Sequence, residues 1–235
     1  MDRIFITGAN RGIGLELVRQ YLGEDTSRIF ATARQPQAAG ELQALVAAHP
    51  GRLTLIPLEV TDEAAIAQAA QTVAGQVEAL DILINNAAMN PPEDTQTLDG
   101  ISVETMLRTL HVNTAAPLMI VKELLNWLRN GHNPRIINIS SEMGSLAERT
   151  YGADYAYCAS KAALNMVTRG LAADLRRDKI TVIALDPGWV QTDMGSPEAD
   201  LTPQESAHGI RAVAESLTLA QTGQFLRWDG QQNPW

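Results

Sequence analysis

Short apolar runs alternate with longer segments of helical length along almost the whole chain, and this alternation most constrains the fold. Several of the runs lack alternating polar residues, which is typical of parallel strands covered on both faces. The expected strands are Ile4–Thr7, Ile29–Ala33, Leu53–Leu58, Ile82–Asn85, Arg135–Ser140, Thr181–Asp186 and Phe225–Trp228. The expected helices are Ile13–Leu22, Gln37–Ala48, Glu63–Val77, Val103–Arg129 and Ala156–Arg177. This order predicts an α/β fold with a doubly wound parallel sheet of about seven strands and helices on both faces.

A single domain over residues 1–235 is expected, because no change in composition and no long linker divides the chain. The least regular stretch is Gly188–Pro203, which is rich in Gly, Pro, Thr and Asp and follows the sixth expected strand. In open α/β sheets the loops beyond the carboxyl ends of the strands form the ligand crevice. We therefore predict that residues 188–203 form a substrate loop or lid, with an ordinary connection as the alternative.

Composition excludes several classes of function. The net charge of −9 argues against a nucleic acid as the main partner. The single cysteine, Cys158, cannot form an internal disulfide, and the four histidines show no metal-ligand spacing, so no metal site is expected. The first residues resemble a strand and not a signal peptide, and no apolar stretch reaches the roughly 18 residues that span a membrane. We expect a soluble, cytoplasmic protein.

A glycine-rich turn joins the first expected strand to the first expected helix. Glycines allow a tight turn and a close approach of a pyrophosphate, and the helix N-terminus then offers free N–H groups to the anion. The spacing is G-x-x-x-G-x-G, which differs from the commonest dinucleotide fingerprint. In this position the turn predicts a Rossmann-type dinucleotide site, with ordinary turn chemistry as the alternative. Its candidate cofactor-binding residues are Gly8, Asn10, Arg11, Gly12, Ile13 and Gly14.

The end of the second expected strand indicates which dinucleotide binds. An acidic residue there would hold the ribose 2′-hydroxyl of NAD, whereas an arginine would accommodate the 2′-phosphate of NADP. This chain has Arg34 and no acid at that point, and Arg11 in the glycine turn is a second candidate for the same phosphate. The sequence therefore favours NADP(H), although either arginine has an alternative as a solvated surface charge.

Tyr157 and Lys161 lie four residues apart on an expected helix, so both side chains project from one face. A nearby ammonium favours phenolate and is expected to lower the pKa of the tyrosine from about 10. Such a tyrosine can donate a proton to a carbonyl oxygen or accept one from an alcohol. Because this spacing is common in helices, the pair gains its weight from the other motifs.

Those motifs together resemble the short-chain dehydrogenase/reductase family. They are Thr7–Gly14, Asn85-Asn86-Ala87-Ala88, Asn113, Ser140-Ser141, Tyr157–Lys161 and Pro187-Gly188, in the order of the family. More narrowly, Pro187–Gly195 and the closing segment Phe225–Trp235 are similar to the sniffer and C-factor-like carbonyl reductases. The resemblance extends from residue 4 to the C-terminus.

The resemblance implies a catalytic tetrad of Asn113, Ser141, Tyr157 and Lys161. Ser141 would bind the substrate carbonyl and Tyr157 would protonate it. Lys161 would hold the nicotinamide ribose and tune Tyr157, and Asn113 would hold a water in a proton relay. The neighbouring Ser140 is the less favoured serine, since strand alternation sends the two side chains to opposite sides.

The resemblance also implies cofactor contacts outside the glycine turn. The implied residues are Glu59, Val60, Asn86, Ala87, Tyr157, Lys161, Pro187, Gly188, Val190 and Thr192. Two positions depart from the family pattern: Glu59 stands where Asp is usual, and Ala88 replaces a glycine. We expect altered affinity from these two changes and not a loss of binding.

These observations together predict an NADPH-dependent oxidoreductase that transfers hydride between the nicotinamide and a carbonyl or secondary alcohol. The alternative is a dinucleotide-binding regulatory or signalling protein with little turnover. Trp189, at the entrance of the 188–203 loop, is a candidate for substrate contact. The long helices Val103–Arg129 and Ala156–Arg177 are rich in apolar residues, and the resemblance implies that the equivalent pair forms a dimer. A homodimer or homotetramer is expected.

Overall fold

The described part of the chain forms seven strands, which lie in one parallel sheet of order β3-β2-β1-β4-β5-β6-β7. The computed structural model describes residues 2–24 and 27–235. The strands are β1 (Arg3–Ile6), β2 (Arg28–Ala33), β3 (Leu53–Pro57), β4 (Ile82–Asn85), β5 (Arg135–Ile139), β6 (Thr181–Asp186) and β7 (Phe225–Arg227). Ile4 pairs with both Ile29 and Ile82, so the strand order reverses at β1, between β2 and β4. The predicted doubly wound sheet is confirmed, and its ligand crevice is expected at this switch point.

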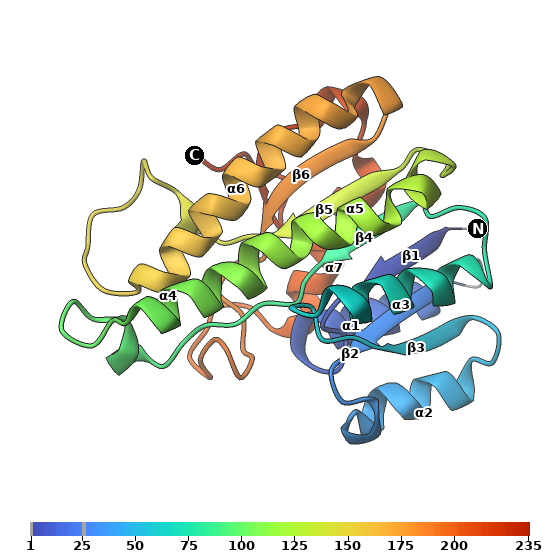
Figure 1. Ribbon diagram of the computed structural model, residues 1–235, viewed down its shortest axis with the longest axis horizontal. Helices are drawn as coiled ribbons and strands as arrows, with labels where there is room; N and C mark the ends of the chain where they lie inside the picture. Colours follow the sequence, from blue (N-terminus) through green and yellow to red (C-terminus); the bar gives the residue numbers. More distant parts are fainter. Residues whose placement is uncertain (1, 25–26) are drawn as a thin grey trace.

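Helices cover both faces of the sheet. They are α1 (Gly12–Leu22), α2 (Gly40–Ala48), α3 (Glu63–Ala74), α4 (Val103–Leu110), α5 (Ala116–Arg129), α6 (Tyr155–Leu175) and α7 (Pro203–Ser216). Short 3₁₀ turns are η1 (Pro36–Ala38), η2 (Glu93–Gln96), η4 (Glu142–Gly144), η5 (Arg176–Asp178) and η6 (Leu219–Gln221). Side chains of α1, α2 and α7 form the core on one face, and those of α3, α5 and α6 form the core on the other. In Figure 1, α5 and α6 lie in front of the sheet and α7 lies behind it.

The expected helix over residues 103–129 is interrupted. The chain forms α4, then a π-helical turn η3 (His111–Ala115), then α5. Hydrophobic spacing does not distinguish one π turn from continuous α-helix, because a single additional residue per turn shifts the pattern only locally. The turn carries Asn113, one of the predicted site residues.

Helix α7 was missing from the predicted elements, although the sequence contains its start signal. Thr202 and Glu205 form a capping box in which the side chain of each accepts a hydrogen bond from the backbone of the other. Pro203 occupies the first turn, where its missing N–H costs nothing. The pattern T-P-x-E is therefore a signal that predicts the start of a helix. Helix α3 has a similar start signal in Asp62, an N-cap residue type that accepts from the N–H groups of Ala64 and Ala65.

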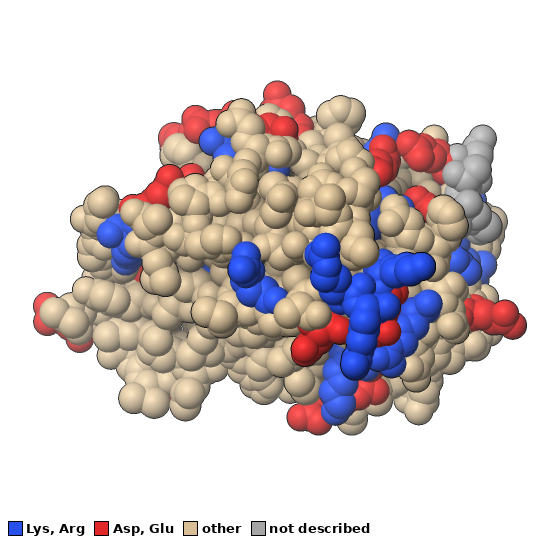
Figure 2. All heavy atoms as spheres, turned by 90° about the horizontal axis from the view of Figure 1, so that it is seen from above, with Lys and Arg blue, Asp and Glu red and all other residues tan. Residues whose placement is uncertain are grey.

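The surface carries charge of both signs. On the face shown in Figure 2, basic side chains gather in one area and acidic side chains lie among and beside them. The protein as a whole carries a net charge of −9. Over residues 2–24 and 27–235, no helix has the length and apolar character needed to cross a membrane.

Candidate functional site

The glycine turn lies between β1 and α1, with glycines where a side chain would collide. Gly8 has a φ of +64°, and a Cβ on Gly14 would lie 2.3 Å from the carbonyl oxygen of Gly8. Helix α1 starts with Arg11 as its N-cap, and the Arg11 side chain makes no capping hydrogen bond. Its first N–H groups are therefore available to an anion at the N-terminus of the helix. The predicted pyrophosphate cradle fits this geometry.

Asn86 fastens the glycine turn from the neighbouring strand. Its Nδ2 donates to the carbonyl oxygens of Thr7 at 2.9 Å and Gly8 at 3.0 Å. The hydroxyl of Thr7 in return accepts from the backbone N–H groups of Asn86 and Ala87, both at 2.9 Å. The segment after β4 and the turn after β1 therefore form one rigid unit at the switch point. Asn86 and Ala87, two of the predicted cofactor residues, thus lie beside the turn.

The two arginines of the predicted phosphate site differ in their surroundings. Arg34, just after β2, is exposed, as a group that meets a charged ligand must be. Arg11 is also exposed but forms an ion pair with Asp193 of the 188–203 loop. Glu59 is occupied as well, because its Oε1 accepts from both the backbone N–H and the hydroxyl of Thr61. Val60 beside it is buried.

Tyr157, Ser141 and Lys161 meet beyond the carboxyl ends of β5 and β6. Ser141 caps η4 by accepting from the N–H of Met143, and its side chain also forms a hydrogen bond with Tyr157. The Nζ of Lys161 lies 5.5 Å from the centre of the Tyr157 ring and donates to the carbonyl oxygen of Ile139 at 2.9 Å. Ser140 lies 1% exposed and donates to Asn165 instead. The arrangement supports Ser141 over Ser140 as the serine beside the tyrosine.

The pKa values in this cluster differ from the sequence expectation. Burial raises the pKa of Tyr157 well above its ordinary value, and the hydrogen bond with Ser141 only partly opposes this. Burial also lowers the pKa of Lys161 to about 8, against the opposing charge of Asp186. The expected lowering of the Tyr157 pKa is not what the structure shows, because desolvation of the phenolate dominates and Lys161 is not among the groups that shift this pKa. The shift favours the neutral phenol of Tyr157.

Asn113 joins three segments of the site. Its Oδ1 accepts from the N–H of Met89 at 2.8 Å, and its Nδ2 donates to the carbonyl oxygen of Met89 and to the hydroxyl of Ser160. Ser160 in turn donates to the carbonyl oxygen of Tyr157 at 2.7 Å. Both amide hydrogens of Asn113 are used within the protein, so its side chain can receive a water only through the second lone pair of Oδ1.

The sequence analysis missed two buried groups that hold Tyr157. Gln96 lies 1% exposed, and its Oε1 accepts from the backbone N–H of Tyr157 at 3.1 Å, a donor that the first turn of α6 leaves free. Ser160 is the second, through the contacts just described. Gln96 lies 61 residues away in the chain, and its position in the sequence carried no signal for this role.

Asp186 is a third missed residue, and here the sequence did carry a signal. It is the last residue of β6 and lies 3% exposed. An acidic residue at the carboxyl end of an otherwise apolar strand, directly before Pro187-Gly188, indicates a polar role at the crevice. Burial raises its pKa.

The 188–203 loop is fastened at both ends. Near its start Gly188 has a φ of +78°, the carbonyl oxygen of Pro187 accepts from Ser206, and buried Val190 forms a bridge with Leu201. Thr192 packs against the glycine turn, since a Cβ on Gly12 would lie 3.2 Å from its methyl group. The loop thus contacts the candidate cofactor site directly.

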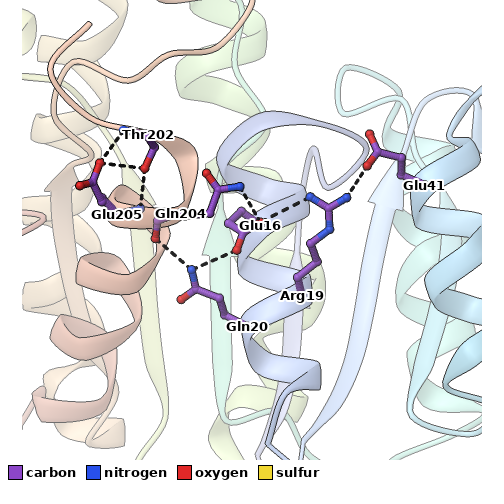
Figure 3. Close-up of polar contacts among 7 residues, drawn as sticks. All are labelled: Glu16, Arg19, Gln20, Glu41, Thr202, Gln204 and Glu205. Atoms are coloured by element: carbon purple, nitrogen blue, oxygen red, sulfur yellow. Dashed lines mark hydrogen bonds and ion pairs between the residues drawn. The ribbon is translucent and has the colours of Figure 1, made fainter.

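A polar network at the far end of this loop connects α7 to α1 (Figure 3). The Nε2 of Gln204 donates to Glu16, and Gln20 donates to the carbonyl oxygen of Gln204 at 3.0 Å. Arg19 of α1 bonds both Glu16 and Glu41. The helix that begins at the glycine turn therefore also holds the end of the 188–203 loop.

The segment before α6 closes another side of the site. Arg149 stacks over the ring of Tyr151 and donates to the sulfur of buried Cys158 at 3.0 Å. The thiol is therefore a packed group that also accepts a hydrogen bond. Within the described parts of the chain, no three His, Cys, Asp or Glu side chains gather as a metal site would require.

Comparison with known proteins places this geometry among similar ones. Residues 2–201 match the family described as short chain dehydrogenase. C-signal of Myxococcus xanthus is 40% identical over 156 residues, which are 66% of this chain and 93% of that protein. NADPH-bound carbonyl reductase from chicken fatty liver superposes with a TM-score of 0.94 at 38% identity, over 100% of this chain and 99% of that one. Carbonyl reductase Sniffer of D. melanogaster superposes with a TM-score of 0.94 at 32% identity, over 100% of both chains.

Proposed function

The chain belongs to the short-chain dehydrogenase family, and on that premise we propose that it is an NADPH-dependent carbonyl reductase. The observation that carries the proposal is the meeting of Tyr157, Ser141 and Lys161 at the carboxyl edge of the sheet, the edge that also bears the glycine turn after β1. The relatives with similar structures support it, since one is an NADPH-bound carbonyl reductase and another is the carbonyl reductase Sniffer.

Reduction of a carbonyl needs a hydride for the carbon and a proton for the oxygen, and the residues of the chain suit both requirements. Bound NADPH supplies the hydride that adds to the carbonyl carbon. Tyr157, protonated because burial raises its pKa, gives its hydroxyl proton to the carbonyl oxygen. Ser141, which already forms a hydrogen bond with Tyr157, is positioned to bind the same oxygen. Lys161 and Asn113 hold the surrounding backbone through Ile139, Met89 and Ser160.

The position of the glycine turn and of the N-terminus of α1 indicates which residues would contact the cofactor. The first N–H groups of α1 would bind the pyrophosphate, and the glycine turn with Asn86 and Ala87 would line the adenosine side. Arg34 would bind the 2′-phosphate, with Arg11 joining it after leaving Asp193. Pro187, Gly188, Val190 and Thr192 would line the nicotinamide side. Glu59 and Val60 would lie near the adenine, and the bond of Glu59 to Thr61 limits its reach.

The substrate class follows from side chains in the two segments beyond β5 and β6. Leu146, Tyr151 and Tyr155 are exposed in the first, and Trp189 and Met194 are exposed in the second. Both segments leave the same edge of the sheet, where parallel strands place their ligand crevice. Exposed apolar and aromatic groups there favour apolar or aromatic carbonyl compounds. The 188–203 loop would close over such a substrate.

The test is loss of NADPH absorbance when the protein is mixed with a panel of quinones, diketones and aldehydes. We expect turnover with at least one aromatic member, and slower turnover with NADH in place of NADPH. Tight NADPH binding without turnover of any member would contradict the proposal and favour a regulatory dinucleotide-binding protein.

We also propose that the protein assembles as a homodimer or homotetramer through α4, α5 and α6. Val103, Leu107 and Met166 are 75%, 62% and 74% exposed, and they lie on α4 and α6, which pack together. Neighbouring exposed apolar side chains of this kind mark an association surface. Light scattering should give the mass of two or four chains, and a monomeric mass would exclude the assembly.

A further inference from the structure

Asp186 links three segments that meet at the site. Its Oδ1 accepts from the N–H of Glu142 at 3.2 Å, in the turn that follows Ser141. The same oxygen accepts from the N–H of Gly188 at 3.3 Å, in the turn that follows β6. The side-chain amide of Asn233, two residues before the last residue, lowers the pKa of this carboxylate, although its Nδ2 makes no hydrogen bond. One carboxylate therefore joins the serine turn to the nicotinamide-side turn, next to the C-terminal tail.

The C-terminal tail is built into this arrangement. Asn233 is 8% exposed, and its N–H donates to the carbonyl oxygen of Phe225 at 2.8 Å. Trp235 stacks on Phe225, and its carbonyl oxygen accepts from the N–H of Ala147 in the segment before α6. The tail is therefore held on two sides, and it can fix the direction of the Asn233 side chain.

Few charges lie around the Asp186 carboxylate. Lys161 and Tyr157 face it from α6, Arg227 from β7 and Glu142 from η4. The hydrogen bonds that hold it come from two backbone N–H groups, and Arg227 instead lies 3.9 Å from Asp229. Hydrogen bonds from neutral N–H groups do not neutralise the negative charge of a carboxylate. The electric field of Asp186 therefore acts on the nearby Lys161 and Tyr157.

We propose that Asp186 is a positioning residue for the Tyr157–Lys161 pair: it joins the Ser141 turn to the Gly188 turn and keeps a fixed negative charge beside the pair. The inference rests on the proposed function in treating that pair as catalytic. The charge favours the ammonium of Lys161 and disfavours the phenolate of Tyr157, so both groups retain their protons. The site is thereby kept in the proton-donating state.

The composition of the chain makes a direct test possible, because Lys122, Lys161 and Lys179 are its only lysines. The ¹³Cε signal of Lys161 would be titrated by NMR in the free protein and assigned with Lys122→Arg and Lys179→Arg. We expect a midpoint near the pKa of about 8 in the wild type. In Asp186→Asn the midpoint should fall by on the order of one pH unit. An unchanged midpoint in that variant would overturn the proposed charge.

Two further variants separate charge from position and from general damage. Asp186→Glu keeps the charge on a longer side chain, so it should restore the Lys161 midpoint while turnover stays reduced. Asp81→Asn removes a buried carboxylate at the opposite end of the sheet, and the Lys161 midpoint should not move. A shift of equal size in Asp81→Asn would show that loosening of the fold, and not the Asp186 charge, moves the midpoint.

The role of the tail has its own measurement. Asn233→Ala removes the side-chain amide that lowers the pKa of Asp186. The ¹³Cγ signal of Asp186 should then titrate at higher pH, and an unchanged midpoint would show that the tail does not hold the carboxylate. These titrations need no substrate, so a failure of the reductase activity would contradict the proposed function and leave the result for Asp186 standing.

Discussion

Two aspartates are buried among residues 2–24 and 27–235, near opposite ends of the sheet, and their surroundings differ. Asp81, directly before β4, is 1% exposed and forms an ion pair with Arg3 at 2.8 Å. It also accepts from the backbone N–H groups of Arg3 and His132. Asp186, at the carboxyl end of β6, is 3% exposed and accepts from two backbone N–H groups, with no direct ion pair to a described residue.

The pKa values of the two groups shift in opposite directions. Burial alone would raise the pKa of Asp81, but the hydrogen bonds from Arg3 and the two backbone N–H groups together lower it. Burial raises the pKa of Asp186, and its hydrogen bonds do not fully compensate. The buried charge of Asp81, at the amino end of β4, therefore stabilises the fold, whereas the buried charge of Asp186, at the carboxyl end of β6, costs stability beside the candidate site.

The largest effect should come from the carboxyl end. Tyr157→Phe removes the hydroxyl that donates the proton and keeps the buried ring. Turnover should fall by at least about 100-fold, as for a lost general acid, while NADPH affinity and thermal stability remain. Steady-state kinetics and a fluorescence titration with NADPH would measure both. Near-wild-type turnover would refute the role of Tyr157.

At the amino end, Asp81→Asn should act on stability alone. It leaves Arg3 without its carboxylate, and because Arg3 is 27% exposed the loss should be roughly 2–3 kcal/mol, below that of a fully buried pair. The wild-type contribution of Asp81 is present above its unfolded pKa and is lost as pH falls, because its folded pKa is lowered. Urea denaturation at pH 7 and pH 3 would measure it. Turnover per folded molecule should not change.

Arg34→Asp tests the cofactor side of the carboxyl end. A charge-assisted contact with the 2′-phosphate is worth about 1.5–3 kcal/mol, so NADPH should bind at least about ten-fold more weakly. NADH lacks the phosphate, and its affinity should remain within a few-fold of the wild type. Equal losses for the two dinucleotides would show that Arg34 does not bind the phosphate.

Asp186→Asn should raise the stability of the fold, whereas Asp81→Asn should lower it. Because the folded pKa of Asp186 is raised, its charge costs stability as pH rises above the unfolded pKa, and the full cost is present above the folded pKa. The amide keeps an acceptor for the two N–H groups without the charge. Thermal unfolding should occur at higher temperature at pH 7, with little difference at pH 3. Destabilisation equal to that of Asp81→Asn at pH 7 would remove the contrast between the two sites.

The smallest effect is expected at the exposed pair of Arg11 and Asp193. Asp193→Asn releases Arg11 to the cofactor phosphate, and because both side chains are more than half exposed the gain is at most about 1 kcal/mol. NADPH should bind up to about five-fold more tightly at low salt. Asp200→Asn, in the same loop, is the matched control and should leave the affinity unchanged.

Much of the fold could be predicted because its signals are local. Apolar runs and helical segments gave the strands and most helices, and Asp62 gave a correct helix start. The π turn at Asn113 could not be predicted, since it depends on contacts with Met89 and Ser160. Helix α7 was missed despite its capping box, which is an error of interpretation and not a missing signal.

The candidate site, like the fold, has features that local sequence predicts and features that depend on distant contacts. The glycine turn and the Tyr157–Lys161 spacing are local patterns, and residue types alone identify their chemistry. The direction of the Tyr157 pKa was wrong in the sequence analysis because desolvation depends on burial by distant segments. The cap that Gln96 provides for Tyr157 joins residues 61 positions apart, and no pattern in the chain announces it.

The sequence by itself therefore determined the order of strands and helices, the glycine turn and the candidate proton donor Tyr157, because each depends on neighbours along the chain. The tertiary structure decided which buried carboxylates form an ion pair and which do not. Asp81 and Asp186 are the same residue type, each beside an apolar strand. Only the folded protein brings Arg3 to one and Asn233 to the other. Electrostatic energies in a protein interior depend on distance and burial, and the fold alone sets both.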